Sequence, residues 1–150
     1  MYNYAMNSVE SQKNTCWWLL QTAWRMKPFL IQIADFHKLT LAQLHLLLMI
    51  EPGQALPMNI ISKFLGCDAS NVTGLVDRLS ARSLISRREH PTDRRVKAIE
   101  LTKEGKMLRE NLLRRLDQLE PEFSKGFSTD EKQCFNQMLC QVLSVPQQVQ

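Results

Sequence analysis

The chain has 150 residues and a formal net charge of +4, with 44% hydrophobic and 23% charged residues. This length and balance are typical of one soluble domain with a sizeable core. Charged residues interrupt the most apolar region, so no run reaches the roughly 18 apolar residues that a membrane span needs. The N-terminus also lacks the pattern of a secretory signal. We therefore expect a cytoplasmic protein with no membrane partner.

Four cysteines occur in the sequence, and their spacing fits none of the usual metal or redox motifs. They are Cys16, Cys67, Cys134 and Cys140. None forms a CxxC pair, and nothing in the sequence places a histidine base beside any of them. The sequence also has no phosphate loop, no carboxylate pair and no Ser-His-Asp order. We expect free thiols, no cofactor, no metal and no enzymatic activity.

The N-terminal third is expected to be helical. Residues 1–13 are polar without an apolar period, whereas residues 14–38 are apolar on more than one face, which indicates burial on several sides. Pro28 lies inside this stretch, where its missing donor and its ring predict a kink or a division of the helix. A capping box from Thr40 to Gln43 then predicts a helix over residues 41–50.

Two short helices are expected next. Residues 51–57 contain two prolines and a glycine, which favour a turn. Apolar residues at helical spacing then predict one helix that ends at Gly66 and a second that begins after Asp68. Two short helices separated only by Gly66 and Cys67 are the pattern of a helix-turn-helix.

The remaining chain predicts a hairpin and two further helices. Residues 85–90 and 96–101 alternate imperfectly, and the proline and aspartate between them favour a hairpin loop. We expect Thr102 to cap a long helix whose apolar residues recur as far as Phe123. A second capping box, Ser128 to Glu131, opens a last helix.

The positive charge of the chain is concentrated in one interval. Residues 82–97 contain six Arg or Lys against two acids, so this interval alone carries +4 and the rest of the chain sums to zero. A local basic patch suggests a polyanion bound at one defined surface. The alternative is an ordinary solvated run of charges.

The helix that begins after Asp68 has a polar face opposite its apolar stripe. This face carries Ser70, Asn71, Thr73, Gly74, Asp77 and Arg78. Short hydroxyl and amide side chains suit base edges in a major groove, and the first-turn amides suit a phosphate. A mid-helix glycine costs about 1 kcal/mol relative to alanine, so Gly74 suggests a surface that a partner approaches closely. The alternative is that these are common cap and surface residues.

The hairpin decides between these alternatives. Arg94 and Arg95 at its tip suit a narrow minor groove, and Asp93 can hold one guanidinium before the nucleic acid arrives. Arg87, Arg88 and Lys97 are expected beside the phosphate backbone. A polar helix followed by an arginine-tipped ribbon predicts a winged helix-turn-helix that binds double-stranded DNA.

These segments resemble the MarR family of bacterial winged-helix transcriptional regulators. The resemblance covers about residues 14–145, and its motifs are Leu39–Gln43, Asn71–Leu79, Leu84–Arg88, Asp93–Arg95 and Leu101–Gly105. It implies that Ser70, Asn71, Thr73 and Gly74 face the major groove and that Asp93 and Arg95 form a wing pair with Arg94 beside them. We add Arg78 and Arg88 to the expected DNA contacts. Ser83 departs from the family, which usually has glycine at that turn.

The resemblance also implies a homodimer on a palindromic operator. We expect one domain over residues 1–150, mostly α with a small β-hairpin wing (α+β). Residues 39–102 would form the winged helix-turn-helix, and residues 14–38 and 103–145 the dimerisation helices. The tryptophans near the N-terminus and the apolar residues near the C-terminus support a dimer independently, because a small winged domain cannot cover them.

The expected function is a sequence-specific transcriptional regulator, in the commoner case a repressor, released by a small aromatic or lipophilic ligand. The ligand candidates are Trp24, Phe29, Phe36 and His37, which are otherwise plain core and dimer contacts. One alternative is an oxidation sensor that uses Cys16 near the start of the first helix. Such a site is expected to have tyrosines nearby, and both tyrosines of the chain lie in residues 1–13. Another is an architectural protein that binds DNA without sequence preference.

Overall fold

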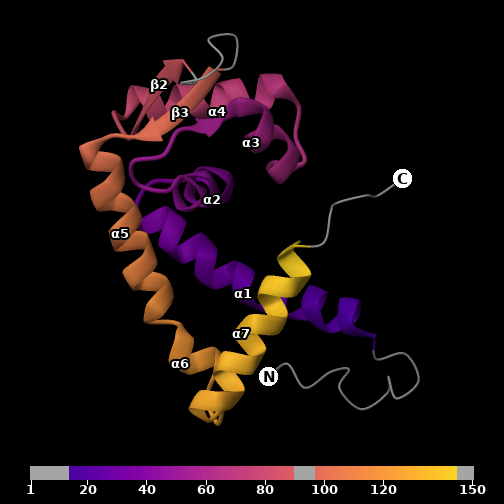
Figure 1. Ribbon diagram of the computed structural model, residues 1–150. Coiled ribbons are helices and arrows are strands. Elements are labelled where there is room, and N and C mark those ends of the chain that lie inside the picture. The colour runs from indigo at the N-terminus through magenta and orange to yellow at the C-terminus, as the bar shows by residue number, and fades with distance from the viewer. Residues whose placement is uncertain (1–13, 90–96, 145–150) are drawn as a thin grey trace. The chain divides into compact units, whose positions relative to one another are not determined.

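The computed structural model describes residues 14–89 and 97–144 (Figure 1). The chain divides into two compact units, residues 1–112 and residues 113–150. Among the described residues, no helix is long and apolar enough to cross a membrane.

Helix α1, Thr15–Phe36, opens the first unit. The side chain of its N-cap, Asn14, accepts a hydrogen bond of 2.9 Å from the amide of Trp17. The sequence predicted a kink or a division at Pro28; the helix continues past it, so the division is wrong. Only Ile33 and Ala34 are buried, both near the C-terminal end. The rest of α1 therefore contributes little to the core of this unit.

Helices α2 (Leu41–Met49), α3 (Met58–Leu65) and α4 (Ala69–Ala81) build the core. The predicted capping box opens α2: Thr40 Oγ1 accepts from the amide of Gln43 at 3.2 Å, and Gln43 Oε1 accepts from the amide of Thr40 at 2.8 Å. Gly66 ends α3 with φ 58°, the left-handed conformation predicted for it. Asp68 occupies the N-cap of α4, but its side chain makes no capping hydrogen bond.

The apolar stripe of α4 is buried as the sequence predicted. It consists of Val72, Leu75, Val76 and Leu79. Leu46, Leu47 and Ile50 from the region of α2, together with Ile61 of α3, are fully buried in the same core. Burying one such side chain contributes about 1.5–3 kcal/mol, so this cluster fixes which face of α4 points outward.

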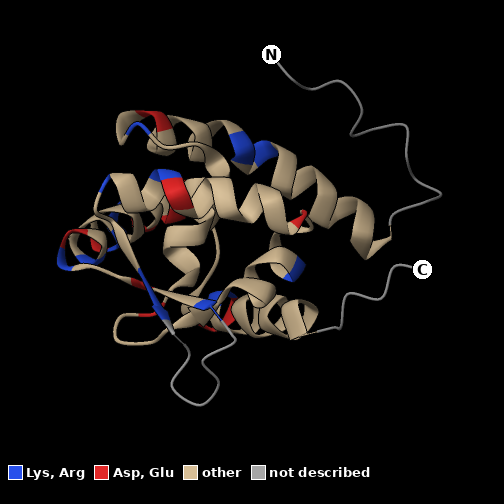
Figure 2. Ribbon diagram, turned by 90° about the horizontal axis from the view of Figure 1, so that it is seen from above, with Lys and Arg blue, Asp and Glu red and all other residues tan. Residues whose placement is uncertain are grey.

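Three antiparallel strands flank α4: β1 (Leu56–Pro57), β2 (Ile85–Glu89) and β3 (Lys97–Leu101), in the order β1-β3-β2. The predicted hairpin is β2–β3, paired from Ile85 with Leu101 to Glu89 with Lys97. Basic residues lie on both strands where they approach the loop that Figure 2 draws in grey.

The short strand β1 was not predicted. Its two residues belong to the segment interpreted as a turn because it contains two prolines and a glycine. Proline is tolerated in an edge strand, where its missing amide costs no ladder hydrogen bond. Pairing with β3 at Leu56 and Pro57 therefore adds a third strand to the hairpin.

Helix α5, Lys103–Asp117, leaves the sheet through a tight junction. Thr102 Oγ1 donates to the carbonyl of Ser83 at 2.6 Å and accepts from the amide of Gly105 at 3.0 Å, so Thr102 caps the helix as predicted. The amide of Thr102 donates to the carbonyl of Leu84 at 3.1 Å. Arg109 then joins α5 to the C-terminal end of α2, where its Nε donates to the carbonyl of Leu48 at 3.3 Å.

The second unit contains the end of α5, the short helix α6 (Glu120–Phe123) and helix α7 (Thr129–Ser144). The sequence predicted one helix through Phe123, which is wrong because α5 ends at Asp117. Pro121 is the physical reason, since it lacks an amide donor and its ring clashes with the preceding turn.

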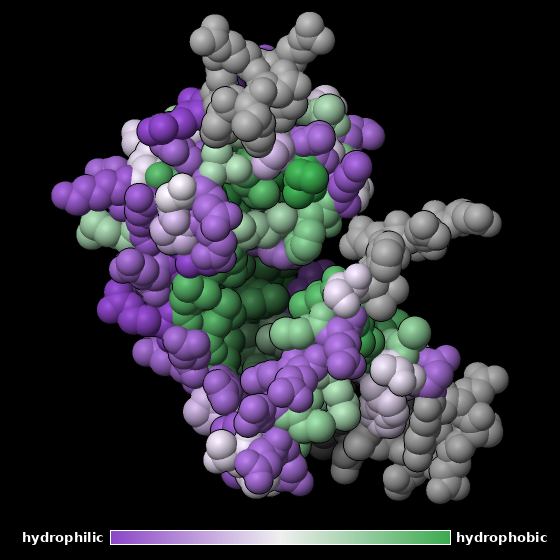
Figure 3. All heavy atoms as spheres, viewed as in Figure 1, coloured by the Kyte–Doolittle hydropathy of each residue, from purple (hydrophilic) through white to green (hydrophobic). Residues whose placement is uncertain are grey.

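Helix α7 opens with the predicted capping box. The amide of Ser128 donates to a carboxylate oxygen of Glu131 at 2.8 Å. Hydrogen bonds from the backbone and the side chain of Ser128 lower the pKa of Glu131 from its ordinary value. No residue of α7 is buried. Phe135, Met138, Val142 and Leu143 are all exposed, the last at 80%. Hydrophobic residues, green in Figure 3, also reach the surface elsewhere on the face shown there.

Candidate nucleic-acid interface

The outward face of α4 carries the residues that the sequence proposed for base contacts. Ser70, Asn71, Thr73 and Arg78 are exposed, and Gly74 is half-buried. Thr73 Oγ1 donates to the carbonyl of Ala69 at 2.9 Å, which leaves its oxygen lone pairs available as acceptors. The buried stripe on the opposite side holds this polar face toward solvent.

Gly74 is not required by packing within the described chain. A Cβ built at this position would meet no atom within 4 Å, and its backbone is helical rather than left-handed. A glycine that costs helix stability without relieving a clash or a strained φ has no explanation in the fold of this unit. The open space at Gly74 would admit the backbone or side chain of a partner close to this part of α4.

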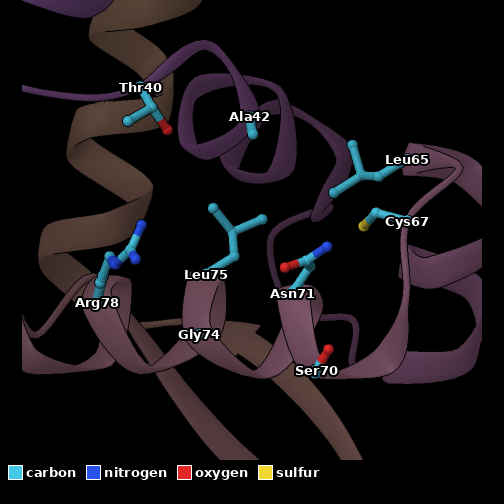
Figure 4. A pocket seen from close by; sticks show the side chains of 9 residues that line it. All are labelled: Thr40, Ala42, Leu65, Cys67, Ser70, Asn71, Gly74, Leu75 and Arg78. Atoms are coloured by element: carbon cyan, nitrogen blue, oxygen red, sulfur yellow. The ribbon is translucent and has the colours of Figure 1, made fainter.

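A concave pocket of about 450 Å³ adjoins this face (Figure 4). Four of the proposed DNA contacts line it: Ser70, Asn71, Gly74 and Arg78. Its other walls come from Thr40 and Ala42 at the start of α2, from Leu65 at the end of α3, from Cys67 in the turn, and from Leu75 of α4. The sequence did not indicate that α2 contributes, because a capping box locates the start of a helix but not its neighbours.

The two neighbouring arginines of β2 face opposite sides of the hairpin. Arg87 forms an ion pair with Asp77 of α4, whereas the Nε of Arg88 lies 2.6 Å from a carboxylate oxygen of Glu100 on β3. Alternation of side chains along a strand is the reason. The sequence placed both beside one phosphate backbone, and the structure does not bring these two side chains together.

Several cations of the basic interval, residues 82–97, contact acceptors that lie outside this interval in the sequence. Arg82 bonds to backbone carbonyls, Arg87 pairs with Asp77, and Arg88 pairs with Glu100. Three of its six cations thus have partners in the first unit, while Lys97 is exposed. Asp93, Arg94 and Arg95, the proposed tip of the wing, lie outside the described residues.

The four ligand candidates are spread along α1 and its C-cap. Trp24 is 57% exposed, with Lys27 Nζ 4.7 Å from its ring centroid, and Phe36 is 70% exposed. The rings of Phe36 and His37 meet edge to face at 5.0 Å, and Phe29 is half-buried. Trp24 and Phe36 are twelve residues apart, which is about 18 Å along a helix. Helix α1 by itself therefore does not gather these residues around one small ligand.

The cysteines fit the expectation of free thiols. Cys16 is exposed in the first turn of α1, Cys67 is half-buried, and Cys134 and Cys140 are exposed. Over residues 14–89 and 97–144, no three His, Cys, Asp or Glu side chains are grouped as metal ligands.

Comparison with known proteins identifies the central segment. Residues 39–97 match the family model described as MarR family. The HTH-type transcriptional repressor YetL of Bacillus subtilis (strain 168) is 40% identical over 77 residues. That match covers 47% of this chain and 42% of YetL, so the chain spans less than half the length of this relative.

Solved structures match over most of the chain. A mutant of MepR from a multidrug-resistant S. aureus clinical isolate has a TM-score of 0.76 at 27% identity, covering 89% of this chain and 98% of that one. A second S. aureus MepR mutant, bound to an oligodeoxyribonucleotide, has a TM-score of 0.58 at 26% identity over the same shares. Apo MarR from E. coli, with a TM-score of 0.72 at 22% identity and the same coverage, shares the fold.

Two helices joined by a short turn, followed by an antiparallel hairpin, define a winged helix-turn-helix, and these matches confirm that predicted fold. Within this class, residues 39–97 match the MarR family model, the family whose motifs the sequence resembles.

Proposed function

We propose that the chain binds duplex DNA through α4 and the β2–β3 hairpin and acts as a transcriptional repressor. The observation that carries the proposal is the exposed polar face of α4, in which Gly74 leaves open space for a close partner. In this arrangement Ser70, Asn71 and Thr73 contact base edges. Arg78 and Arg88 contact the backbone, and Arg94 and Arg95 of the wing enter the adjacent minor groove, with Asp93 paired to Arg95.

The comparisons support this proposal. YetL, which matches part of the chain, is a repressor, and the MepR mutant with a matching fold is bound to an oligodeoxyribonucleotide. The Arg87–Asp77 ion pair also supports it, since it neutralises the only carboxylate on the outward face of α4 that would repel phosphates.

We further propose a homodimer on a palindromic operator, with residues 14–38 and 103–145 as the dimerisation helices. Exposed apolar side chains in both segments support it. In α1 they include Trp17 at 40% and Trp18 at 42% exposure, and in α7 Met138 at 56%. Two copies related by a two-fold axis would place their recognition helices in half-sites about 10 bp apart.

Selection from random duplexes tests the proposal. Duplexes retained by the chain should contain inverted repeats and bind at least about a thousandfold more tightly than random duplex at physiological salt. Asn71→Ala should weaken binding of the selected duplex by about 1–3 kcal/mol. Asn136→Ala, an equally exposed asparagine of α7, is the matched control and should leave affinity unchanged. Equal affinity for selected and random duplex would instead favour an architectural protein.

Release by a small aromatic or lipophilic ligand is the proposed mode of regulation, with Phe36 and His37 at one end of α1 as its contacts and Trp24 and Phe29 nearer the middle. Compounds that release the selected duplex should quench tryptophan fluorescence, and Trp24→Phe should remove that quenching if Trp24 is in contact. The alternative is oxidation of the exposed Cys16. Peroxide should then release DNA from the parent chain and not from Cys16→Ser.

A further inference from the structure

The ends of α1 and α4 share one construction, which the end of α3 at Gly66 also resembles. At the end of α1, the amide of Leu39 donates to the carbonyl of Ala34 at 2.8 Å, and Lys38 has φ 54°. At the end of α4, the amide of Leu84 donates to the carbonyl of Leu79 at 3.1 Å, and Ser83 has φ 56°. These are the bonds and the left-handed residue of a Schellman motif.

Such an end leaves the carbonyls of its last residues for donors from elsewhere. At the end of α1 the donor is Arg82, the C-cap residue of α4. Its Nη1 donates to the carbonyl of Lys38 at 2.7 Å, and its Nη2 donates to the carbonyl of His37 at 3.0 Å. One guanidinium thus joins the end of α4 to the end of α1. Its two acceptors lie 44 and 45 residues before Arg82 in the chain.

The geometry of this contact restrains orientation as well as distance. A guanidinium is planar and rigid, so two bonds from its separate nitrogens fix both the position and the direction of the group. The acceptors belong to a helix C-terminus, whose partial negative charge favours a cation. The other described contacts that hold α4 are those of its apolar stripe, which have little directionality, and the ion pair of Asp77 with Arg87 of β2.

We propose that Arg82 is a positioning residue that fixes the recognition helix α4 to the C-terminal end of α1 and so sets the angle at which α4 meets DNA. This proposal rests on the proposed function, because it assigns α4 the role of reading base edges. It makes α1 the reference for α4, so that a displacement of the end of α1 is passed directly to the base-reading surface.

Arg82 is exposed, so a direct contact with a phosphate is the competing explanation for any effect of its replacement. Salt dependence separates the two explanations. Loss of a phosphate contact lowers the slope of log affinity against log salt by about 1. Loss of a positioning contact lowers affinity at every salt concentration and leaves the slope unchanged.

The experiment compares Arg82→Ala, Arg82→Gln and Arg82→Lys with Arg25→Gln, an exposed arginine of α1 that controls for net charge. The probes are a duplex selected by the parent chain and a random duplex, at a temperature where circular dichroism shows every variant folded. We expect Arg82→Ala and Arg82→Gln to bind the selected duplex about tenfold more weakly, with an unchanged salt slope. A tenfold loss is the size expected when a misplaced α4 loses one good base contact. Binding to random duplex should change much less, and Arg82→Lys should recover part of the loss.

Hydrogen exchange supplies a measurement that is independent of DNA. The amides of Leu39 and Leu84, which close the two helix ends, should exchange faster in Arg82→Ala than in the parent chain. Unchanged exchange at both ends, unchanged affinity for the selected duplex, or a salt slope lowered by about 1 would each overturn the proposal. If the parent chain selects no duplex, the proposed function fails, and the exchange measurement still decides whether Arg82 fixes α4.

Discussion

Gly74 is the residue at which stability and the proposed function conflict most clearly. Alanine at this position would meet no atom within 4 Å. It would raise the helix propensity of α4 by about 1 kcal/mol. We expect Gly74→Ala to increase the free energy of unfolding by about that amount, measured by denaturant titration, and to weaken binding of a selected duplex. Misfolding cannot produce both results, whereas tighter DNA binding by the more stable variant would remove Gly74 from the interface.

The backbone conformation at Ser83 explains why glycine is usual at this turn in the MarR family, which the sequence resembles. Its φ of 56° is left-handed, a conformation that costs a residue with a Cβ about 1–2 kcal/mol. Ser83→Gly removes this strain but frees the unfolded backbone, which offsets about 0.4–1 kcal/mol. We expect a net gain of between zero and about 1.5 kcal/mol in the free energy of unfolding. Ser86→Gly, in the adjacent strand, should lower it, since that position has no positive φ.

Local contacts were predictable at this scale, and distant ones were not. Both capping boxes join residues three positions apart, so the sequence displays them directly. The partners of Arg82 lie more than 40 residues away, and that of Arg87 belongs to another element. Sequence spacing carries no information on such contacts. The sequence therefore predicts a basic patch that includes Arg82 and Arg87, and only the structure shows their acceptors.

At the scale of elements, the junction between β2 and α5 depends on Gly105. A Cβ at Gly105 would lie 1.9 Å from the carbonyl oxygen of Leu84, a backbone atom that also accepts from the amide of Thr102. The amide of Leu84 also donates to the carbonyl of Leu79, so hydrogen bonds hold both sides of the Leu84 backbone. Moving this backbone away from a Cβ would therefore cost free energy. We expect Gly105→Ala to lower the free energy of unfolding by about 1–3 kcal/mol despite the better helix propensity of alanine.

Gly74→Ala is the matched control for this prediction, because both changes add one methyl group within a helix and the expected signs are opposite. Denaturant titration of the two variants side by side checks it. A Gly105→Ala variant as stable as the parent chain would show that α5 shifts against β2 at little cost.

The order and type of the main elements followed from hydrophobic periodicity and caps, which are local signals. Two elements did not. Strand β1 is only two residues long and exists because β3 offers it a partner, so no signal within the strand predicts it. Helix α6 is separate because Pro121 interrupts a leucine period that otherwise continues to Phe123. Pro121 breaks the backbone hydrogen bonding of the helix, and the apolar period alone does not show this.

At the scale of the whole molecule, the exposed apolar side chains favour the proposed dimer. Large exposed apolar surface is rare in soluble monomers, and here the exposed apolar side chains include the three tryptophans of α1 and, separately in the second unit, Phe135, Met138, Val142 and Leu143 of α7. The proposed dimer would cover it. The dimer would also place two copies of α4 in one complex, which the single unit cannot do, and so convert weak recognition of a half-site into binding of a full palindrome.

The proposed dimer predicts a mass of twice 17.4 kDa by light scattering and a melting temperature that rises with protein concentration. Met138→Glu, which adds a charge to an exposed apolar residue of α7, should shift the mass toward 17.4 kDa and reduce binding of a palindromic duplex. Gln137→Glu adds the same charge at the adjacent exposed position and should change neither. Because Met138 is 56% exposed in the single chain, the charge has little cost there, so a lower mass would report a lost interface rather than an unfolded monomer. A parent chain of 17.4 kDa that still binds the selected palindrome would contradict the dimer and leave α1 and α7 without their proposed role.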